Sequence, residues 1–281
     1  MNEAVVELAR EYFSGGDVPL VLLHGLYGSK RNWRTAAKKL SSTAHVDVYS
    51  LDLRHHGESP NKGGFSLKAL ASDVLAFIDS RIRVPAIILG HSIGGKIGLQ
   101  AALACPEKTA GLILADISPF DLPEHVCGEL RSITDALTGL SLSRLTDRRE
   151  AEAILSKNIP DTRIVRFLLQ SLVRNTGPSG PSYRWQIGID AVKEGFDEVC
   201  RGVLPQTLLP EQLAVREMPL LCIRGGSSPF FPENHIHRLR TVFPLLEART
   251  VENAGHWLHV EKQDEFIGMV GDFIRRHGFS S

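Results

Sequence analysis

The amino-acid sequence predicts an α/β protein, in which a mostly parallel sheet carries helices on both faces and a helical segment is inserted into the fold. Strand-like and helix-like patterns alternate over about the first 115 residues, as they do where helical crossovers join parallel strands. The pattern becomes mostly helical between residues 119 and 216, and the alternation then resumes. A chain of 281 residues is long enough for one large core with such an insertion.

The first part of the chain contains short apolar or alternating runs that are typical of strands. We expect these strands at residues 4–13, 19–23, 46–53, 86–89 and 112–115. Between them, apolar residues at helical spacing predict helices at residues 33–40 and 67–82. The alternation of the two patterns predicts parallel strands covered by helices on both sides.

The middle of the chain lacks this alternation. Helical spacing predicts helices at residues 124–140, 147–158 and 161–174, and a turn-rich stretch with two prolines and two glycines follows at residues 175–182. Later we expect strands at 219–223 and 248–251 and helices at 232–243 and 260–277. The sequence therefore predicts a core of residues 1–118 and 217–281 and a helical cap, or lid, of residues 119–216.

The composition excludes several classes of partner. Lysine plus arginine equals aspartate plus glutamate, at 32 each, so we expect neither nucleic acid nor an anionic membrane surface as a partner. No run approaches the ~18–20 apolar residues that cross a bilayer, and the acidic N-terminus is unlike a signal peptide. No oligomeric interface can be identified from the sequence.

The cysteines and the known ligand-binding motifs set further expectations. The four cysteines show no metal-binding spacing, so we expect reduced thiols in a cytoplasmic protein. The sequence contains none of the phosphate-binding, zinc-binding or calcium-binding loops whose spacing identifies a nucleotide or a metal, so we expect no metal and no cofactor.

The most informative run is the G-x-S-x-G pentapeptide at residues 90–94, which directly follows the apolar strand 86–89. This arrangement predicts a nucleophile elbow, a tight turn between a strand and a helix that raises the serine side chain above the sheet. Small residues are needed there because a Cβ atom would crowd the strained turn. The run therefore identifies Ser92 as a candidate nucleophile.

A serine hydroxyl needs a base to attack a carbonyl group, and His256 is the best candidate among eleven histidines. It lies in the loop 253–257, after the strand 248–251 and before the last helix. In hydrolases with a nucleophile elbow, the residues follow the chain order serine, acid, histidine, with the histidine after the last strand. His256 fits that order with Ser92.

The acid is harder to identify. The loop 225–229, after the strand that returns from the cap, contains no carboxylate, and Glu233 beyond it is expected in the first turn of a helix. Asp116 follows the strand after the nucleophile strand. Because neighbouring strands lie ~4.8 Å apart, a carboxylate there can reach the same imidazole. We therefore favour Asp116 and keep Glu233 as the alternative.

An oxyanion hole completes the predicted constellation. The loop 24–29 contains two glycines and ends a buried strand, so the backbone N–H groups of Leu26 and Ile93 are expected to meet beside Ser92. We expect His24 to orient this loop beside the substrate rather than to transfer protons. The polar run 52–59 follows another strand and is expected to brace the same loops.

These motifs together resemble those of α/β-hydrolase-fold enzymes, and more narrowly those of the YbfF-type bacterial esterases and their mitochondrial animal relatives. The residues that carry the resemblance are 24–29, 52–59, 90–96, 116–119 and 253–257. The resemblance implies a mostly parallel sheet of eight strands with an inserted cap. It assigns the family's serine, acid and histidine to Ser92, Asp116 and His256, and it implies hydrolysis of carboxylic esters and of thioesters such as acyl-CoA.

We therefore expect a serine hydrolase that acts on a small-molecule ester or thioester. Substrate selection is expected in the cap, where Phe167 and Trp185 either face the cleft or pack within the cap, and His24 and Trp257 are further candidates for substrate contact. Two other functions remain open. The same triad serves C–C bond hydrolases and perhydrolases, and some proteins of this fold bind a ligand without catalysis.

Overall fold

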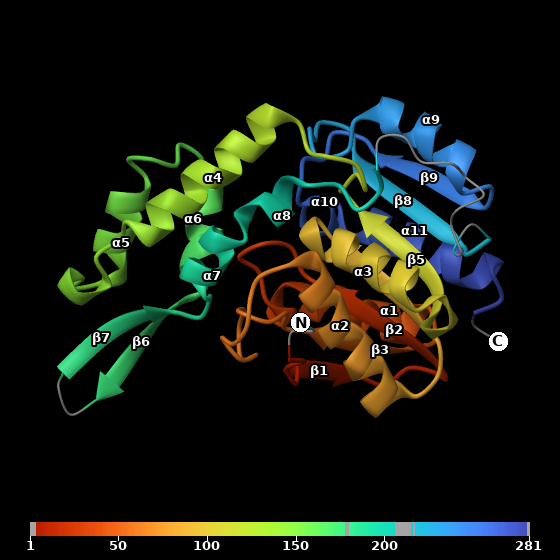
Figure 1. Cartoon of the computed structure of the whole chain (residues 1–281), viewed down its shortest axis with the longest axis horizontal. Helices are drawn as coiled ribbons and strands as arrows, with labels where there is room; N and C mark the ends of the chain where they lie inside the picture. The colour runs from red at the N-terminus through yellow and green to blue at the C-terminus, as the bar shows by residue number, and fades with distance from the viewer. Residues whose placement is uncertain (1–3, 178–179, 206–214, 216, 280–281) are drawn as a thin grey trace.

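The computed structural model describes residues 4–177, 180–205, 215 and 217–279, and within them a seven-stranded sheet forms the centre of the molecule (Figure 1). Its strand order is β1-β3-β2-β4-β5-β8-β9. All neighbouring strands are parallel except β1 and β3, which are antiparallel. The strands are β1 (Arg10–Phe13), β2 (Val18–Leu23), β3 (Val46–Leu51), β4 (Ala86–His91), β5 (Thr109–Ala115), β8 (Leu220–Gly225) and β9 (Leu246–Val251). The predicted fold class is confirmed.

Helices cover both faces of this sheet, because successive side chains of a buried strand point to opposite faces. In β2, Leu20 and Leu22 pack in the same cluster as the helices α1 (Arg34–Thr43) and α11 (Gln263–Arg276). Val21 and Leu23 pack in the cluster on the other face, beneath α2 (Leu67–Phe77), α3 (Ile93–Ala104) and α9 (Glu233–Val242). The short helices are η1 (Lys30–Trp33), η2 (Ile78–Ile82), η3 (Pro106–Lys108) and α10 (Leu258–Glu261).

The expected count of eight strands is wrong for the described residues, and so is the length of the first strand. Only Arg10–Phe13 pairs with β3. In the preceding segment, the backbone N–H of Val6 donates to Asp73 Oδ1, and that of Ala9 donates to Ser59 Oγ. Because side chains satisfy these backbone groups, the alternating residues before position 10 need no strand partner.

Between β5 and β8 the chain leaves the sheet and forms a separate group of elements beside it (Figure 1). We call residues 119–216 the cap segment. Its elements are α4 (Glu124–Thr138), η4 (Leu142–Arg144), α5 (Arg148–Leu155), α6 (Thr162–Leu169), β6 (Leu172–Gly177), β7 (Gly180–Trp185), α7 (Ile189–Glu194) and α8 (Phe196–Cys200).

The hairpin β6–β7 differs from the sequence expectation, which placed only a helix end and turns in this region. The two strands pair antiparallel from Leu172 opposite Trp185 outward. The pair Leu172 and Trp185 is buried at the base of the hairpin, and β-branched or aromatic residues such as Val173 and Tyr183 favour the extended conformation. Apolar burial at its base therefore stabilises a hairpin where proline and glycine indicated only a loop.

The expectation of four reduced cysteines is also wrong. Cys127 in α4 and Cys200 at the end of α8 form a disulfide, with Cα atoms 5.8 Å apart, whereas Cys105 and Cys222 are free. The two partners are separated by 73 residues, so no local spacing pointed to their pairing. The bond joins α4 to α8, which are the first and last helices that the structure describes in the cap segment.

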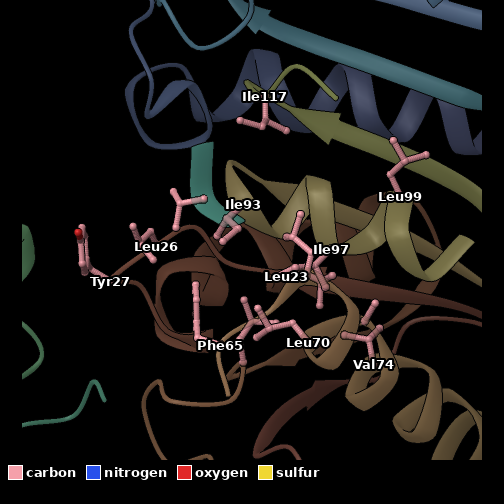
Figure 2. Close-up of a cluster of buried hydrophobic side chains, with 14 of the residues drawn as sticks. Leu23, Leu26, Tyr27, Phe65, Leu70, Val74, Ile93, Ile97, Leu99 and Ile117 are labelled. Atoms are coloured by element: carbon pink, nitrogen blue, oxygen red, sulfur yellow. The ribbon is translucent and has the colours of Figure 1, made fainter. Parts of the chain in front are cut away.

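The core beneath the expected elbow is apolar and closely packed (Figure 2). Ile93 and Ile97 of α3 lie near Leu70 and Val74 of α2 in Figure 2, and Leu23 at the end of β2 belongs to the same cluster. This packing holds the start of α3 against the sheet edge. None of the helices in the described part of the chain is both long and apolar enough to span a bilayer.

Candidate active site

Ser92 stands between β4 and α3 in a strained backbone conformation, with φ 55° and ψ −128°. Positive φ is rare for residues other than glycine and persists only where the surroundings hold it. A Cβ on Gly90 would lie 2.2 Å from the backbone of Gly94, and one on Gly94 would lie 2.6 Å from the carbonyl oxygen of Leu23. The glycines therefore permit the turn that the G-x-S-x-G run predicted.

Asp116 directly follows β5 and accepts three hydrogen bonds. Nδ1 of His256 donates to its Oδ2 over 2.7 Å, and the backbone N–H of Gly225 donates to its Oδ1 over 2.8 Å. The hydroxyl of Ser228 also donates to Oδ2. Asp116 itself is fully buried and has φ 50°. The carboxylate is thus aimed at the imidazole by donors from the last residue of β8 and from the loop after it.

Glu233, the alternative acid, lies elsewhere. It is the first residue of α9, its side chain is 83% exposed, and its Oε2 lies 3.7 Å from Nη1 of Arg224. The structure therefore brings Asp116, and not Glu233, to His256.

His256 is held from several directions. The ring of Phe230 stacks on its imidazole at a centroid distance of 3.6 Å. Nε2 of His91 donates to the backbone carbonyl oxygen of His256 over 2.8 Å. Burial, together with the neighbouring His259 and His256, holds the pKa of His91 well below its usual range, so His91 is a neutral donor. Sequence reasoning missed both, because Phe230 belongs to no catalytic motif and His91 occupies a variable position of the G-x-S-x-G run.

Ser228 was also missed, although a signal was present. The loop after the strand that returns from the cap lacks a carboxylate, and Ser228 in that loop donates instead to the carboxylate of Asp116. The hydroxyl of Ser228, in a loop without a carboxylate, was the signal that could have identified this hydrogen-bond donor to the acid.

The loop after β2 approaches the serine closely. A Cβ on Gly25 would lie 3.2 Å from Cβ of Ser92, so the backbone of this loop lies directly beside the elbow. The backbone N–H of Ile93 begins α3 and has no acceptor within that helix. Leu26 lines the same cavity as Ser92. The two backbone groups expected to form an oxyanion hole thus come from adjoining segments.

His24 lines this cavity, but both of its ring nitrogens already have partners within the protein. Nδ1 donates to the carbonyl oxygen of Gly25 over 2.8 Å, and Nε2 accepts from the backbone N–H of Leu53 over 3.0 Å. Burial lowers the pKa of His24 and keeps it neutral, which suits one donating and one accepting nitrogen. His24 therefore braces the loop.

The polar run after β3 has the bracing role that the sequence predicted. Asp52 accepts from the backbone N–H of Lys30 over 2.7 Å, from Nζ of Lys30 over 2.5 Å and from the backbone N–H of Glu58 over 2.9 Å. Asp52 is fully buried, and these bonds hold the pKa of its carboxyl below the usual range despite burial. The network connects the loop after β2 to the loop after β3.

Ser92 and His256 line one cavity of about 1010 Å³ between the sheet edge and the cap segment. The cap contributes apolar side chains to the lining, including Phe167. The centroid of the Phe167 ring lies 5.5 Å from that of Trp257, which lines the same cavity from the core. Trp185 is not among the lining residues and is instead buried in the hydrophobic core next to Leu172. Of the four side chains expected at the substrate, His24, Phe167 and Trp257 line the cavity and Trp185 does not.

Several histidines surround the site without forming a metal centre. The ring of His91 lies 4.6 Å from that of His256 and 4.4 Å from that of His259. Burial lowers the pKa of His259 to about 3. Among the described residues, no three or more histidine, cysteine, aspartate or glutamate side chains are arranged to hold a metal ion.

Comparison with known proteins identifies the family. A family model described as alpha/beta hydrolase fold matches residues 18–263. The chain is 29% identical over 257 residues to the mouse protein named sn-1-specific diacylglycerol lipase ABHD11, covering 91% of this chain and 80% of that protein. It is 27% identical over 256 residues to Esterase YbfF of Escherichia coli, covering 91% and 92% of the two chains.

A solved structure titled "Marine microorganism esterase" has a TM-score of 0.86 and 31% identity, covering 95% of this chain and 99% of that chain. The similarity to these proteins extends through both the sheet and the cap segment. The chain therefore belongs to the alpha/beta hydrolase fold family, in which these relatives are named as esterases and a lipase.

Proposed function

We propose that this protein is a serine hydrolase that cleaves carboxylic esters through an acyl-enzyme, with Ser92, His256 and Asp116 as its catalytic triad. The observation that carries the proposal is the 2.7 Å bond from His256 to Asp116 beside a cavity that Ser92 and His256 share. The names of the esterase and lipase relatives support ester hydrolysis as the reaction.

In the proposed mechanism, Ser92 Oγ attacks the ester carbonyl carbon while Nε2 of His256 takes the hydroxyl proton. Asp116 accepts the Nδ1–H bond, which leaves Nε2 free to act as the base and stabilises the imidazolium that forms. His256 then returns the proton to the leaving alcohol. Water, deprotonated by the same imidazole, hydrolyses the acyl-enzyme and restores Ser92.

The tetrahedral intermediate carries an oxyanion, which the backbone N–H groups of Leu26 and Ile93 would stabilise. These donors belong to a braced loop and to the start of a helix, so they need little reorganisation during the reaction. Loss of one such donor typically costs ~10²–10³ in rate. The bracing by His24 therefore contributes to catalysis without proton transfer.

The cap segment supplies much of the cavity wall and is proposed to select the substrate. Its half-buried apolar residues Ile164 and Phe167 line the cavity together with Trp257 of the core, and this apolar wall suits an acyl chain better than a polar acyl group. A cavity of about 1010 Å³ has room for a long chain. The mouse relative's name, a diacylglycerol lipase, supports lipid esters as the class, and acyl thioesters are the second candidate.

The test is hydrolysis of p-nitrophenyl acetate, butyrate and octanoate, with palmitoyl-CoA alongside, by the wild type and by Ser92→Ala. Turnover that increases with chain length and disappears in Ser92→Ala is the expected result. Turnover that survives in a folded Ser92→Ala variant would exclude Ser92 as the nucleophile. Activity restricted to diketones would favour C–C bond hydrolysis by the same triad.

A further inference from the structure

A second, smaller cavity of about 310 Å³ adjoins the catalytic cavity. The two share six lining residues, so they are neighbouring chambers of one space between the core and the cap segment; the shared residues are Tyr27, Gly28, Arg31, Asn32, Phe167 and Gln170. We call the smaller cavity the side chamber. Its remaining lining comes from Ser29 and Gly57 of the core and from Arg148, Ser171 and Gln186 of the cap segment.

The two chambers differ in charge. In the catalytic cavity, three arginines are balanced by three carboxylates among the lining residues, namely Arg31, Arg163 and Arg166 against Glu129, Asp161 and Glu261. In the side chamber, Arg31 and Arg148 are the charged lining residues, and no carboxylate lines it among the residues that the structure describes. The lining of the side chamber therefore bears two arginines and no carboxylate, and Glu58, which does not line it, is the ion-pair partner of Arg31.

The two arginines have donors to spare. Nη2 of Arg31 lies 3.4 Å from Oε1 of Glu58, a carboxylate whose other oxygen already accepts from Nζ of Lys30 over 2.9 Å. Arg148 donates from Nη2 to the carbonyl oxygen of Leu169. A guanidinium group has five N–H donors, so these contacts leave most of them available to a ligand.

The side chamber is also correctly placed for a substrate at Ser92. The loop after β2 lies against Ser92 at Gly25, and Tyr27 and Gly28 of the same loop line the side chamber as well. A substrate seated at the serine can extend past this loop into the side chamber. The amide and hydroxyl side chains of Gln170, Gln186 and Ser171 provide further polar partners there.

We propose that the side chamber binds an anionic group of the substrate, a carboxylate or a phosphate, and that Arg31 and Arg148 determine this specificity. Planar guanidinium groups bind both anions in bidentate fashion. The inference rests on the proposed role of Ser92. The preferred substrate is then an ester with one apolar part in the catalytic cavity and a negative charge at its other end.

The kinetic test compares two pairs of esters, and the members of each pair differ in whether they carry one anionic group. One pair is p-nitrophenyl hexanoate and mono-p-nitrophenyl adipate; the other is monobutyrylglycerol and its 3-phosphate. In the wild type, the anionic member of at least one pair has the higher kcat/KM, and the pair that shows this identifies the anion. The double variant Arg31→Met/Arg148→Met is expected to lower the ratio of anionic to neutral kcat/KM by about 10–100-fold, the size of a lost charge-assisted hydrogen bond.

Matched variants make the test specific. Arg149→Met removes a charge from the neighbouring position of α5, which lines neither chamber, and leaves both ratios unchanged. Arg148→Lys retains the charge and is expected to recover part of the preference. Ratios that are equal in the wild type and the double variant would overturn the proposal.

A binding measurement separates this proposal from the proposed function. In Ser92→Ala, calorimetry with adipate and with glycerol 3-phosphate is expected to show binding that the double substitution weakens at least tenfold. Absence of binding by both anions would overturn the side chamber's role even if ester hydrolysis is found. Binding without hydrolysis of any ester would instead contradict the proposed function alone.

Discussion

Nδ1 of His256 lies 2.7 Å from Oδ2 of Asp116, although the two residues are 140 positions apart in the chain. The sheet order explains the contact. Ser92, Asp116, Ser228 and His256 follow β4, β5, β8 and β9, which are four adjacent parallel strands. Because the carboxyl ends of parallel strands meet at one edge of the sheet, each strand delivers one polar side chain to the same place.

Asp116→Asn is expected to lower kcat by about 10³–10⁴-fold, because an amide in place of the carboxylate favours the wrong tautomer of His256. The measurement is steady-state hydrolysis of p-nitrophenyl butyrate, with circular dichroism to verify the fold. Glu233→Gln is the control, since this exposed carboxylate lies by Arg224, and its rate is expected to stay near that of the wild type. The reverse pattern would make Glu233 the acid.

Ser228→Ala is expected to lower kcat about 10-fold and to reduce the free energy of unfolding by about 1–3 kcal/mol. The substitution removes a buried donor to Asp116 while leaving the Gly225 N–H bond in place. A positioning role predicts a change in kcat with little change in KM. Ser227→Ala, which removes an exposed hydroxyl from the same loop, should have a much smaller effect. Equal effects of both variants would contradict a specific role for Ser228.

Gly90→Ala and Gly128→Ala are expected to change stability in opposite directions. A Cβ on Gly90 would lie 2.2 Å from backbone atoms of the elbow, which implies a loss of about 3 kcal/mol or more, or failure to fold. Gly128 lies in α4 with no atom within 4 Å of an added Cβ, so alanine there should stabilise by about 0.5–1 kcal/mol. Urea unfolding measures both. A tolerated Gly90→Ala would show that the elbow is less constrained than its geometry implies.

Lys96 connects the elbow helix to the cap segment and is expected to make stability depend on pH. Its buried Nζ donates to the carbonyl oxygens of Val199, Cys200 and Arg201. Burial lowers the pKa of Lys96 to about 7, although the negative charges of Asp121 and Glu198 act to raise it. Between pH 7 and about 10.4, the unfolded chain then binds more protons at this site than the folded chain. The free energy of unfolding therefore rises with pH, by at most ~1.4 kcal/mol per unit from this group.

The check is urea unfolding of the wild type and Lys96→Met at pH 6, 7, 8 and 9. The wild type should gain stability relative to the variant as the pH rises above 7. A stability difference that stays constant from pH 6 to pH 9 would show that Lys96 keeps its ordinary pKa in the folded protein.

The sequence allowed much of the fold and site geometry to be predicted. The strands and helices of the core follow from periodicities of two and 3.6 residues, and the elbow follows from the steric need for small residues around Ser92. The proximity of Asp116 to His256 could be predicted because adjacent parallel strands bring their ends together. The count of eight strands came from the resemblance, whereas the strand patterns themselves number seven, as does the described sheet. The first strand is shorter than expected because side chains such as Asp73 satisfy the backbone before β1.

By itself, the sequence determined the fold class, the elbow and the order of the polar residues along the chain, because contiguous residues specify turns, periodicity and strand ends. Only the tertiary structure decided which distant side chains touch. It paired Cys127 with Cys200, placed Phe230 on His256, buried Trp185 away from the cavity and brought Arg31 and Arg148 to one chamber. Such contacts depend on how separate elements pack, and no local pattern encodes that packing.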